Sequence, residues 1–249
     1  MMPQLGVALV RIDAETAIRC GAYLTAAEHR ACAAQRVASR RMQSACARVA
    51  AKWLRLELAE GRSAPLVALD AASLTSHARG QYLDVALSGP GGTAPRFADQ
   101  RVAVSLSHAG EVAAAAVSPA GAVGVDVERV EPRSAAFADE HFTPQERDAF
   151  TFRSPRRADR AALETLLWSV KEALYKSGAL TLPPRFSFRD IELSTSLAGS
   201  PFALPSVRTF ALMACGVRFF CRSVLTRTFA LAAVVEAPPD PVLARSIQP

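Results

Sequence analysis

The sequence predicts an α+β protein, and three observations carry that prediction. Two capping boxes, in which a threonine precedes a glutamate by three residues, each open a helical segment at Thr25–Glu28 and Thr143–Glu146. Short apolar runs with β-strand character occur in both halves, among them residues 5–12 and 122–130. The length of 249 residues suffices for one large domain or two of about 120 residues each.

The first hundred residues predict a strand, a helical segment and a loop. Residues 5–12 form the strand. The capping box at Thr25 begins an Ala- and Arg-rich segment that reaches about Glu60, which is long enough for two helices. Residues 88–97 contain three glycines and two prolines, so they are expected to form an irregular loop.

The middle of the chain predicts three strands. Residues 102–107 and 112–118 form a pair that is joined by a turn at 108–111. Pro-Ala-Gly at 119–121 interrupts this pattern, and we place the boundary between two halves of the chain near 119–122. Residues 122–130 then form the third strand.

The remaining residues predict two helices followed by β structure. Pro144 occupies the first helical position after Thr143, and this helix runs toward Phe152. Four arginines between 153 and 160 indicate an exposed connection, and residues 161–177 form a strong helix that Gly178 ends. Three β segments follow, at 188–193, at 208–222 with interruptions, and at 228–235, before a proline-rich tail from 238. No internal repeat is evident in the sequence.

Composition narrows the class of protein. The net charge of +6 and the pI of about 9.4 favour acidic partners such as nucleic acid, anionic lipid, phosphorylated cofactors or an acidic protein, with a solvated basic surface as the plain alternative. The five cysteines contain no Cys-x-x-Cys pair, which argues against a disulfide framework or a zinc ribbon. No apolar run reaches about 18 residues, so no membrane span is expected. We therefore expect a reduced, cytoplasmic protein.

Lysine is rare in this chain. Of its 29 basic side chains only three are lysines, and two of them, Lys171 and Lys176, lie within six residues of each other. A compact ammonium differs from a guanidinium fork in reach and hydration, so the shape of the positive charge is expected to matter there.

Asp126 and Glu128 stand two residues apart in the strand predicted at 122–130. Both carboxylates therefore share one face of the strand, while Val125 and Val127 face the core. Adjacent carboxylates repel each other unless a cation lies between them, and such hard oxygen ligands suit Mg²⁺ or Mn²⁺. The alternative, which the spacing alone favours, is the solvent-exposed polar face of an edge strand.

Glu172 and Lys176 stand four residues apart on the helix predicted at 161–177. A pair at this spacing is most often a weak surface ion pair. The functional alternative makes Glu172 a third metal-binding carboxylate and Lys176 a contact for a phosphate.

Three further positions are candidates for phosphate contacts. His108 follows Ser107 at a strand end, where both side chains can donate to a phosphate. Arg40 and Arg48 lie eight residues apart on the long helical segment and share a face. A structural histidine and solvated arginines are the alternatives.

Four motifs resemble, in this order, those of the 4′-phosphopantetheinyl transferases: Ser105-Leu-Ser-His108, Gly124-Val-Asp-Val-Glu128, Phe142-Thr-Pro-Gln-Glu146 and Trp168-Ser-Val-Lys-Glu-Ala-Leu-Tyr-Lys176. The second and fourth, about 40 residues apart, are together highly specific, and the resemblance covers about residues 24–235. The length and the Asp-x-Glu form are similar to the surfactin-type group. This resemblance implies a monomer with two similar α+β halves, residues 1–120 and 121–249, which are related by a pseudo-two-fold axis and enclose the active site in the cleft between them.

The resemblance also implies a reaction and a metal. In this family a serine of an apo acyl or peptidyl carrier protein attacks the β-phosphate of coenzyme A, 4′-phosphopantetheine is transferred, and 3′,5′-ADP leaves. The positions that match Asp126, Glu128 and Glu172 hold Mg²⁺ against the pyrophosphate. The position of Glu172 is also a candidate for deprotonating the serine, directly or through water.

The remaining residues that the resemblance implicates would bind coenzyme A. They are Lys176 at the pyrophosphate, Ser107 and His108 at the phosphates, Arg48 and, with it, Arg40 near the nucleotide, and Pro95 in the loop before the Ser-His strand. Family members commonly have Gly-Lys-Pro in that loop, whereas this chain has Thr93-Ala-Pro95. Ala94 thus replaces the expected lysine, so that either Arg96 substitutes for it or the loop contacts coenzyme A differently.

Two other functions stay open at this point. A non-catalytic relative would bind coenzyme A or a carrier protein without transfer, although the complete acidic set argues against it. A nucleic-acid-binding protein would account for the pI, but the arginines are spread widely and no basic motif is interleaved with aromatic residues. We therefore expect neither nucleic acid nor membrane as a partner. The motifs do not specify the carrier pathway, the tolerance for acylated coenzyme A, or Mg²⁺ over Mn²⁺.

Overall fold

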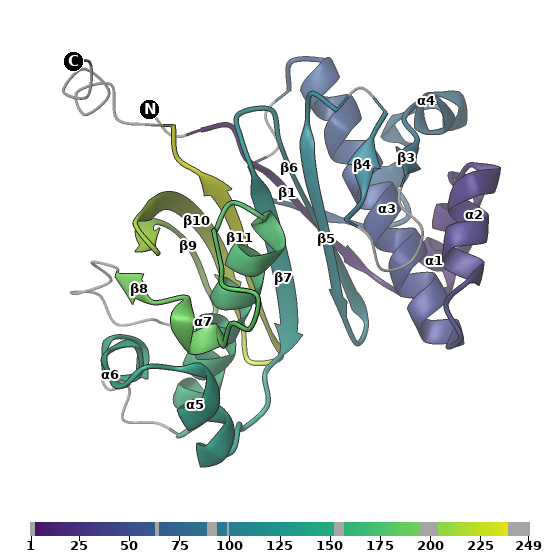
Figure 1. Ribbon diagram of the computed structural model, residues 1–249. Coiled ribbons are helices and arrows are strands. Elements are labelled where there is room, and N and C mark those ends of the chain that lie inside the picture. Colours follow the sequence, from purple (N-terminus) through teal and green to yellow (C-terminus); the bar gives the residue numbers. More distant parts are fainter. Residues whose placement is uncertain are drawn as a thin grey trace, which may run out of the picture.

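A computed structural model of the protein describes residues 3–62, 65–88, 94–98, 100–151, 157–194 and 204–238. Two β-sheets lie side by side, and one long helix packs on each: α3 (Ala38–Ala59) on the N-terminal sheet and α7 (Arg157–Ser177) on the C-terminal sheet (Figure 1). The predicted α+β class is confirmed. Within the described ranges, no helix combines the length and the apolar character needed to cross a membrane.

The N-terminal sheet has the strand order β2-β1-β6-β5. Its strands are β1 (Gly6–Arg11), β2 (Val67–Leu69), β5 (Ala103–Ala109) and β6 (Val112–Ser118). β1 runs parallel to β2 and antiparallel to β6, which forms a hairpin with β5. The turn predicted at 108–111 is too long, because Gly110 adopts a φ of 55° and closes a tighter turn. His108 therefore lies within β5, opposite Ala113.

Smaller N-terminal elements surround α3. They are α1 (Ala14–Ala22), α2 (Ala26–Ala33), the 3-10 helix η1 (Ser73–Ser76), α4 (Arg79–Asp84), and the paired strands β3 (Leu87–Ser88) and β4 (Arg96–Phe97). α2 and α3 confirm the two helices expected before Glu60, and Thr25 and Glu28 make both hydrogen bonds of the predicted capping box. α1 and α4 were not predicted from the sequence. Residues 89–93 of the predicted loop lie outside the described residues, and β3 and β4 pair on either side of them.

The C-terminal sheet is antiparallel throughout, in the order β7-β11-β10-β9-β8. Its strands are β7 (Val123–Arg129), β8 (Leu193–Ser194), β9 (Ser206–Ala214), β10 (Val217–Leu225) and β11 (Phe229–Glu236). β7 and β11 confirm the strands predicted at 122–130 and 228–235. The interrupted segment predicted at 208–222 is a hairpin of β9 and β10. Two helices, α5 (Ala135–His141) and α6 (Pro144–Thr151), precede α7, and α5 was not predicted.

Two C-terminal predictions are wrong. Residues 188–193 are not one strand, because Ser187 caps the 3-10 helix η2 (Phe188–Asp190) by accepting from the N–H of Arg189 at 3.2 Å. The connection predicted at 153–160 is too long, since α7 already begins at Arg157. Residues 152–156 and the tail from 239 lie outside the described residues.

A buried glutamate–lysine pair holds the N-terminal half together. The ammonium of Lys52, on α3, lies 2.7 Å from the Glu28 carboxylate and 3.0 Å from the carbonyl oxygen of Tyr23. Glu28 also accepts a hydrogen bond from the backbone N–H of Leu87 at 3.0 Å. Both side chains of the pair are completely buried. We call this arrangement the Glu–Lys clamp.

The C-terminal half repeats the Glu–Lys clamp. Lys171, on α7, lies 2.7 Å from Glu146 and 3.0 Å from the carbonyl oxygen of His141, and Glu146 accepts from the N–H of Leu193 at 2.9 Å. In each half the glutamate belongs to the capping box and the lysine to the long helix. The two halves thus share a repeat that is not evident in the sequence, because the matched residues are few and widely spaced.

The two sheets meet along β5 and β7. The hydroxyl of Ser105 accepts a hydrogen bond from the N–H of Val125 at 3.0 Å, and that of Ser107 accepts from the N–H of Val127 at 3.3 Å. We call this contact the hydroxyl seam. Behind it, one apolar cluster contains buried residues of both sheets, among them Val7, Ala114, Val125 and Leu231. The predicted boundary at 119–122 falls in the turn between β6 and β7.

Candidate active site

β7 presents two carboxylates to α7. Val125 and Val127 point into the apolar cluster between the sheets, and the alternating residues Asp126 and Glu128 therefore point to the opposite face. Only 3% of the Asp126 side chain is exposed, against 34% for Glu128. The alternative of a solvent-exposed polar face is therefore wrong for Asp126.

Gly124 lets α7 come close to this strand. A Cβ atom at Gly124 would lie 1.8 Å from the carbonyl oxygen of Ala173 and 2.8 Å from the backbone nitrogen of Ser177, which no side chain can tolerate. Both contacts are backbone atoms of α7. The glycine thus sets the distance at which Glu172 and Lys176, on the same stretch of helix, face Asp126.

Asp126 is the centre of the contacts at this site. Its Oδ1 accepts a hydrogen bond from the Lys176 ammonium at 2.6 Å and another from the Ser107 hydroxyl at 3.0 Å. Lys176 also lies 3.3 Å from the Ser107 oxygen. Among the described residues, Oδ2 of Asp126 is buried and has no hydrogen-bond partner. A buried carboxylate oxygen without a partner is costly, and it indicates a site for a ligand that the oxygen can bind.

Glu128 and Glu172 are the other two carboxylates of the site. Burial raises the pKa of the Glu128 carboxyl, and the negative charge of Asp126 adds to that rise. Burial likewise raises the pKa of Glu172, which lies 4.0 Å from Lys176; the ammonium opposes the rise, while Asp126 and Glu128 add to it. Three carboxylates that repel one another favour a bound cation.

These residues fit a divalent metal. The donor set consists of carboxylate oxygens from Asp126, Glu128 and Glu172, which is the hard oxygen chemistry that Mg²⁺ and Mn²⁺ prefer. The unpartnered Oδ2 of Asp126 supplies an available ligand atom. The chemistry of these oxygens supports the metal set expected from the sequence, which stays a prediction because the ligand atoms of the three carboxylates do not all lie within 4.8 Å of one another.

Arg133 lies on the other side of Glu128 and was missed by the sequence interpretation. Its guanidinium is 3.5 Å from the Glu128 carboxylate and 4.9 Å from the centre of the Phe137 ring. The indole of Trp168 also lowers the pKa of the Glu128 carboxyl, against the rise that burial causes. Arg133 occurs among many arginines, so nothing in the sequence singles it out.

His108 faces away from Asp126 and toward α3. Its Nδ1 lies 3.0 Å from the guanidinium of Arg40. Since a guanidinium only donates, Nδ1 accepts and the ring proton resides on Nε2. Burial lowers the pKa of His108, and the charge of Arg40 lowers it further. The neutral ring therefore presents an Nε2–H donor.

The other predicted contacts of coenzyme A are spread around this site. Arg48 is buried and donates to the carbonyl oxygen of Leu87 at 3.4 Å. Pro95 and Arg96 line a pocket of about 270 Å³ together with Lys176. Thr93, in the same loop, lies outside the described residues. The structure thus brings Asp126, Ser107 and Lys176 into direct contact, places Arg40 on His108, and puts Pro95 beside Lys176.

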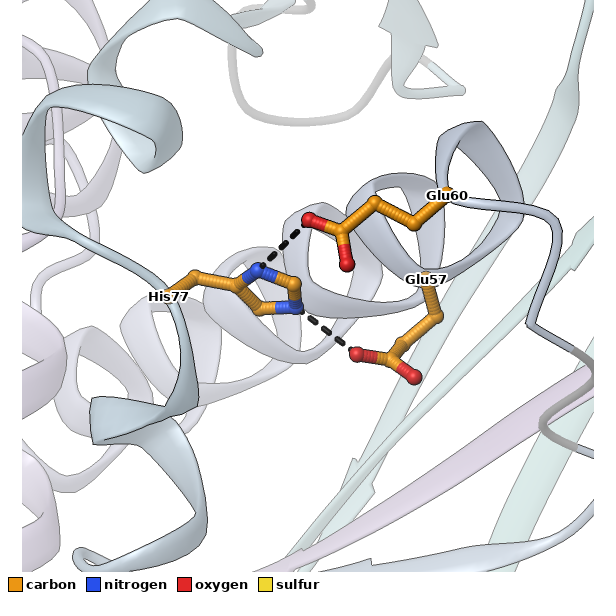
Figure 2. A group of neighbouring side chains, drawn as sticks. All are labelled: Glu57, Glu60 and His77. Atoms are coloured by element: carbon orange, nitrogen blue, oxygen red, sulfur yellow. Dashed lines mark hydrogen bonds and ion pairs between the residues drawn. The ribbon is translucent and has the colours of Figure 1, made fainter.

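A second cluster of possible metal ligands lies in the N-terminal half (Figure 2). His77 Nε2 lies 2.8 Å from Glu57, and its Nδ1 lies 3.5 Å from Glu60. However, the Arg62 guanidinium binds both oxygens of Glu57, at 2.6 and 2.7 Å, and also contacts Glu60. The guanidinium of Arg62 thus already occupies both oxygens of Glu57 and contacts Glu60, so we interpret the cluster as structural.

Comparison with known proteins gives one match. Residues 122–225 match the family model described as the 4′-phosphopantetheinyl transferase superfamily. This range includes β7 and α7, and therefore all three carboxylates and Lys176. No curated protein matches the chain.

Proposed function

We propose that this chain transfers 4′-phosphopantetheine from coenzyme A to a serine of an apo carrier protein, because residues 122–225 match the family model of the 4′-phosphopantetheinyl transferase superfamily. One observation supports this proposal most strongly. The matched region holds a buried Asp126 with an unpartnered oxygen, next to two further carboxylates of raised pKa. A phosphate-transfer site needs such a cation-binding centre.

In this proposal Asp126, Glu128 and Glu172 hold the divalent metal. Bound there, Mg²⁺ would neutralise the pyrophosphate of coenzyme A and favour departure of 3′,5′-ADP. Lys176 and the Nε2–H of His108 bind phosphate oxygens. Ser107 orients Asp126 through its 3.0 Å hydrogen bond.

Glu172 is the proposed general base. The hydroxyl oxygen of the carrier serine forms a bond to the β-phosphorus, the bond from that phosphorus to the oxygen of 3′,5′-ADP breaks, and the serine proton moves to the Glu172 carboxylate, directly or through water. Burial raises the pKa of Glu172, which makes its carboxylate a better proton acceptor than an ordinary glutamate.

The rest of the proposal concerns the nucleotide and the partner. Arg40 and Arg48 would lie near the nucleotide, and Pro95 near the pantetheine pyrophosphate. Coenzyme A would occupy the cleft between halves 1–120 and 121–249 of a cytoplasmic monomer of the surfactin-type group. The net charge of +6 favours association with an acidic carrier protein.

Intact-mass spectrometry tests the proposed function. An apo carrier protein incubated with this chain, coenzyme A and Mg²⁺ should gain the mass of one phosphopantetheine, and EDTA should prevent the gain. Glu172→Gln and Asp126→Asn should each lower the rate at least about 100-fold, the usual contribution of a general base or its equivalent. Glu164→Gln is the matched control, because Glu164 is a partly buried carboxylate on the same helix, outside the site.

Lys176→Arg tests whether the site needs an ammonium group or only a positive charge. The ammonium of Lys176 approaches Asp126 to 2.6 Å, and the larger guanidinium fork should not fit this contact. Turnover should therefore fall although the charge is kept. If coenzyme A binds but no carrier is modified by the wild-type protein, the chain is a non-catalytic relative; if coenzyme A does not bind, the proposed function is wrong.

A further inference from the structure

Lys176 differs from the two other lysines of this chain. Lys52 and Lys171 are completely buried, and each is bound by a glutamate and by backbone carbonyl oxygens. Lys176 has 31% of its side chain exposed, and its partners among the described residues are the side chains of Asp126, Ser107 and Glu172. It also stands in the last turn of α7, directly before Ser177 and Gly178, where the helix ends. Its ammonium can therefore leave its present partners without unfolding the helix.

The carboxylate that Lys176 binds is also the one best suited to bind a metal. The ammonium lies 2.6 Å from Oδ1 of Asp126, while Oδ2 of the same group is the buried oxygen without a partner among the described residues. A divalent cation on Asp126 and an ammonium on Asp126 would repel each other across a single carboxylate. Ser107, which also donates to Oδ1, is neutral and would not oppose the cation.

We propose that Lys176 and the divalent metal compete for Asp126, and that the phosphates of coenzyme A relieve this competition by taking over the ammonium. Lys176 is then a positioning residue toward the metal as well as a contact of the substrate. This inference rests on the proposed function, since it assigns the relieving anion to coenzyme A. It predicts that the metal and coenzyme A bind with positive coupling, each raising the affinity of the other.

A Mn²⁺ titration tests the competition without any turnover. The protein is first treated with EDTA and desalted, and electron paramagnetic resonance then measures how much Mn²⁺ it binds. Lys176→Met, which keeps the length of the side chain and removes its charge, should bind Mn²⁺ more tightly than the wild type in the absence of coenzyme A. The expected gain is about 5- to 150-fold, the range of typical coupling between sites. Lys176→Arg retains the positive charge near Asp126 but should not fit the 2.6 Å contact, so its Mn²⁺ affinity should lie between those of the wild type and Lys176→Met. Unchanged or weaker binding of Mn²⁺ by Lys176→Met would overturn the proposal.

Two controls locate the effect. Asp126→Asn in the Lys176→Met background should abolish the tight binding, which shows that Mn²⁺ occupies the predicted site. Arg133→Met removes a cation from the far side of Glu128, which it contacts at 3.5 Å. It should raise the affinity less than Lys176→Met, since Arg133 does not contact Asp126. A larger effect of Arg133→Met would indicate that general electrostatics, and not competition at Asp126, controls binding.

The second part of the experiment repeats the Mn²⁺ titration in the presence of coenzyme A. Saturating coenzyme A should raise the Mn²⁺ affinity of the wild type and should raise that of Lys176→Met by a smaller factor; equal factors would contradict relief through Lys176. The two proposals fail separately. If Lys176→Met binds Mn²⁺ more tightly but the wild type modifies no carrier, the competition stands and the proposed function falls. If the wild type modifies the carrier and Lys176→Met leaves Mn²⁺ affinity unchanged, the function stands and the competition falls.

Discussion

At the scale of single residues, the site depends on a glycine as much as on its charged groups. Gly124 faces backbone atoms of α7 at distances that leave no room for a methyl group. The residue carries no chemistry, yet it decides whether Glu172 and Lys176 can reach Asp126. A glycine inside a β-type run already suggests close approach of another backbone, although the sequence does not say which segment approaches.

Gly124→Ala should therefore impair both stability and function. Its Cβ would lie 1.8 Å from the Ala173 carbonyl oxygen, so α7 must move away from β7. We expect a loss of about 1–3 kcal/mol in the free energy of unfolding, together with weaker Mn²⁺ binding. Urea denaturation measures the first and paramagnetic resonance the second. Gly21→Ala, in α1 with open space around its Cβ, should be neutral or slightly stabilising; a similar loss in both variants would contradict this explanation.

Glu172 should make the protein less stable as the pH rises. Burial raises its pKa above the ordinary value of 4.5, so the folded state favours the protonated form. The resulting stabilisation is present at low pH and is lost as the pH rises from 4.5 through the raised pKa. Asp126, Glu128 and Lys176 face the same carboxyl group and share in this balance.

Glu172→Gln should remove the loss of stability that the wild type shows as the pH rises. In EDTA at pH 8 the variant should unfold at a higher urea concentration than the wild type, while at pH 4.5 the difference should shrink. Urea midpoints across this pH range measure the effect; Glu164→Gln on the same helix, whose carboxyl pKa burial also raises, should show a change of the same sign. The explanation fails if the wild type and Glu172→Gln show the same dependence on pH.

At the scale of secondary-structure elements, the Glu–Lys clamps fix the two long helices. Lys52 and Lys171 each satisfy a glutamate that would otherwise be buried without a counter-charge. Burial lowers the pKa of both ammonium groups, and the facing glutamate opposes this shift. The three lysines of the chain therefore fall into two groups: Lys52 and Lys171 are buried in the clamps, and Lys176 lies at the proposed metal site.

Lys52→Met and Lys171→Met should each lower the free energy of unfolding by about 3–5 kcal/mol, because each leaves a buried carboxylate without its partner. The double replacements Glu28→Gln with Lys52→Met, and Glu146→Gln with Lys171→Met, should recover part of the loss. Chemical denaturation of the four variants measures this. Losses below about 1 kcal/mol in the single variants would show that the clamps do not hold the helices.

The sequence predicts these elements unequally. Capping boxes and long helical segments predict α2, α3 and α7, and alternation predicts β7 with its two carboxylates on one face. Short elements such as α5 and η2 are missed, because they depend on local capping by Ser134 and Ser187 more than on periodicity. The clamp is also missed, because Lys171 and Glu146 are joined by tertiary contact alone.

At the scale of the whole molecule, the site is assembled across the hydroxyl seam. Ser105 and Ser107 both lie on β5 and both accept a backbone N–H of β7. Only Ser107 also contacts Asp126 and Lys176. The sequence could identify Ser107 through its motif, but the contact itself depends on how two sheets pack, which no local pattern specifies.

Ser105→Ala and Ser107→Ala should separate the fold from the site. Each leaves a buried N–H of β7 without an acceptor, which costs about 1–3 kcal/mol in the free energy of unfolding. Ser107→Ala should in addition change Mn²⁺ affinity and slow transfer, whereas Ser105→Ala should change neither once the protein is folded. Denaturation combined with Mn²⁺ titration distinguishes them, and equal effects on metal binding would contradict the assignment of Ser107.

Strands β1 and β7 occupy matching positions in the two halves, but only β7 carries acidic side chains. β1 and β7 both pair with the last strand of their half, and Val7 and Val125 both point into the shared apolar cluster. Ala8 and Val10 of β1, which point toward α3 in the N-terminal core, thus correspond to Asp126 and Glu128. The molecule should accordingly bind Mn²⁺ at a single site, with one Mn²⁺ per chain and a hyperbolic saturation curve in the presence of saturating coenzyme A. The same clamp and the same sheet edge thus occur in both halves, while the three carboxylates of the proposed metal site occur in one of them.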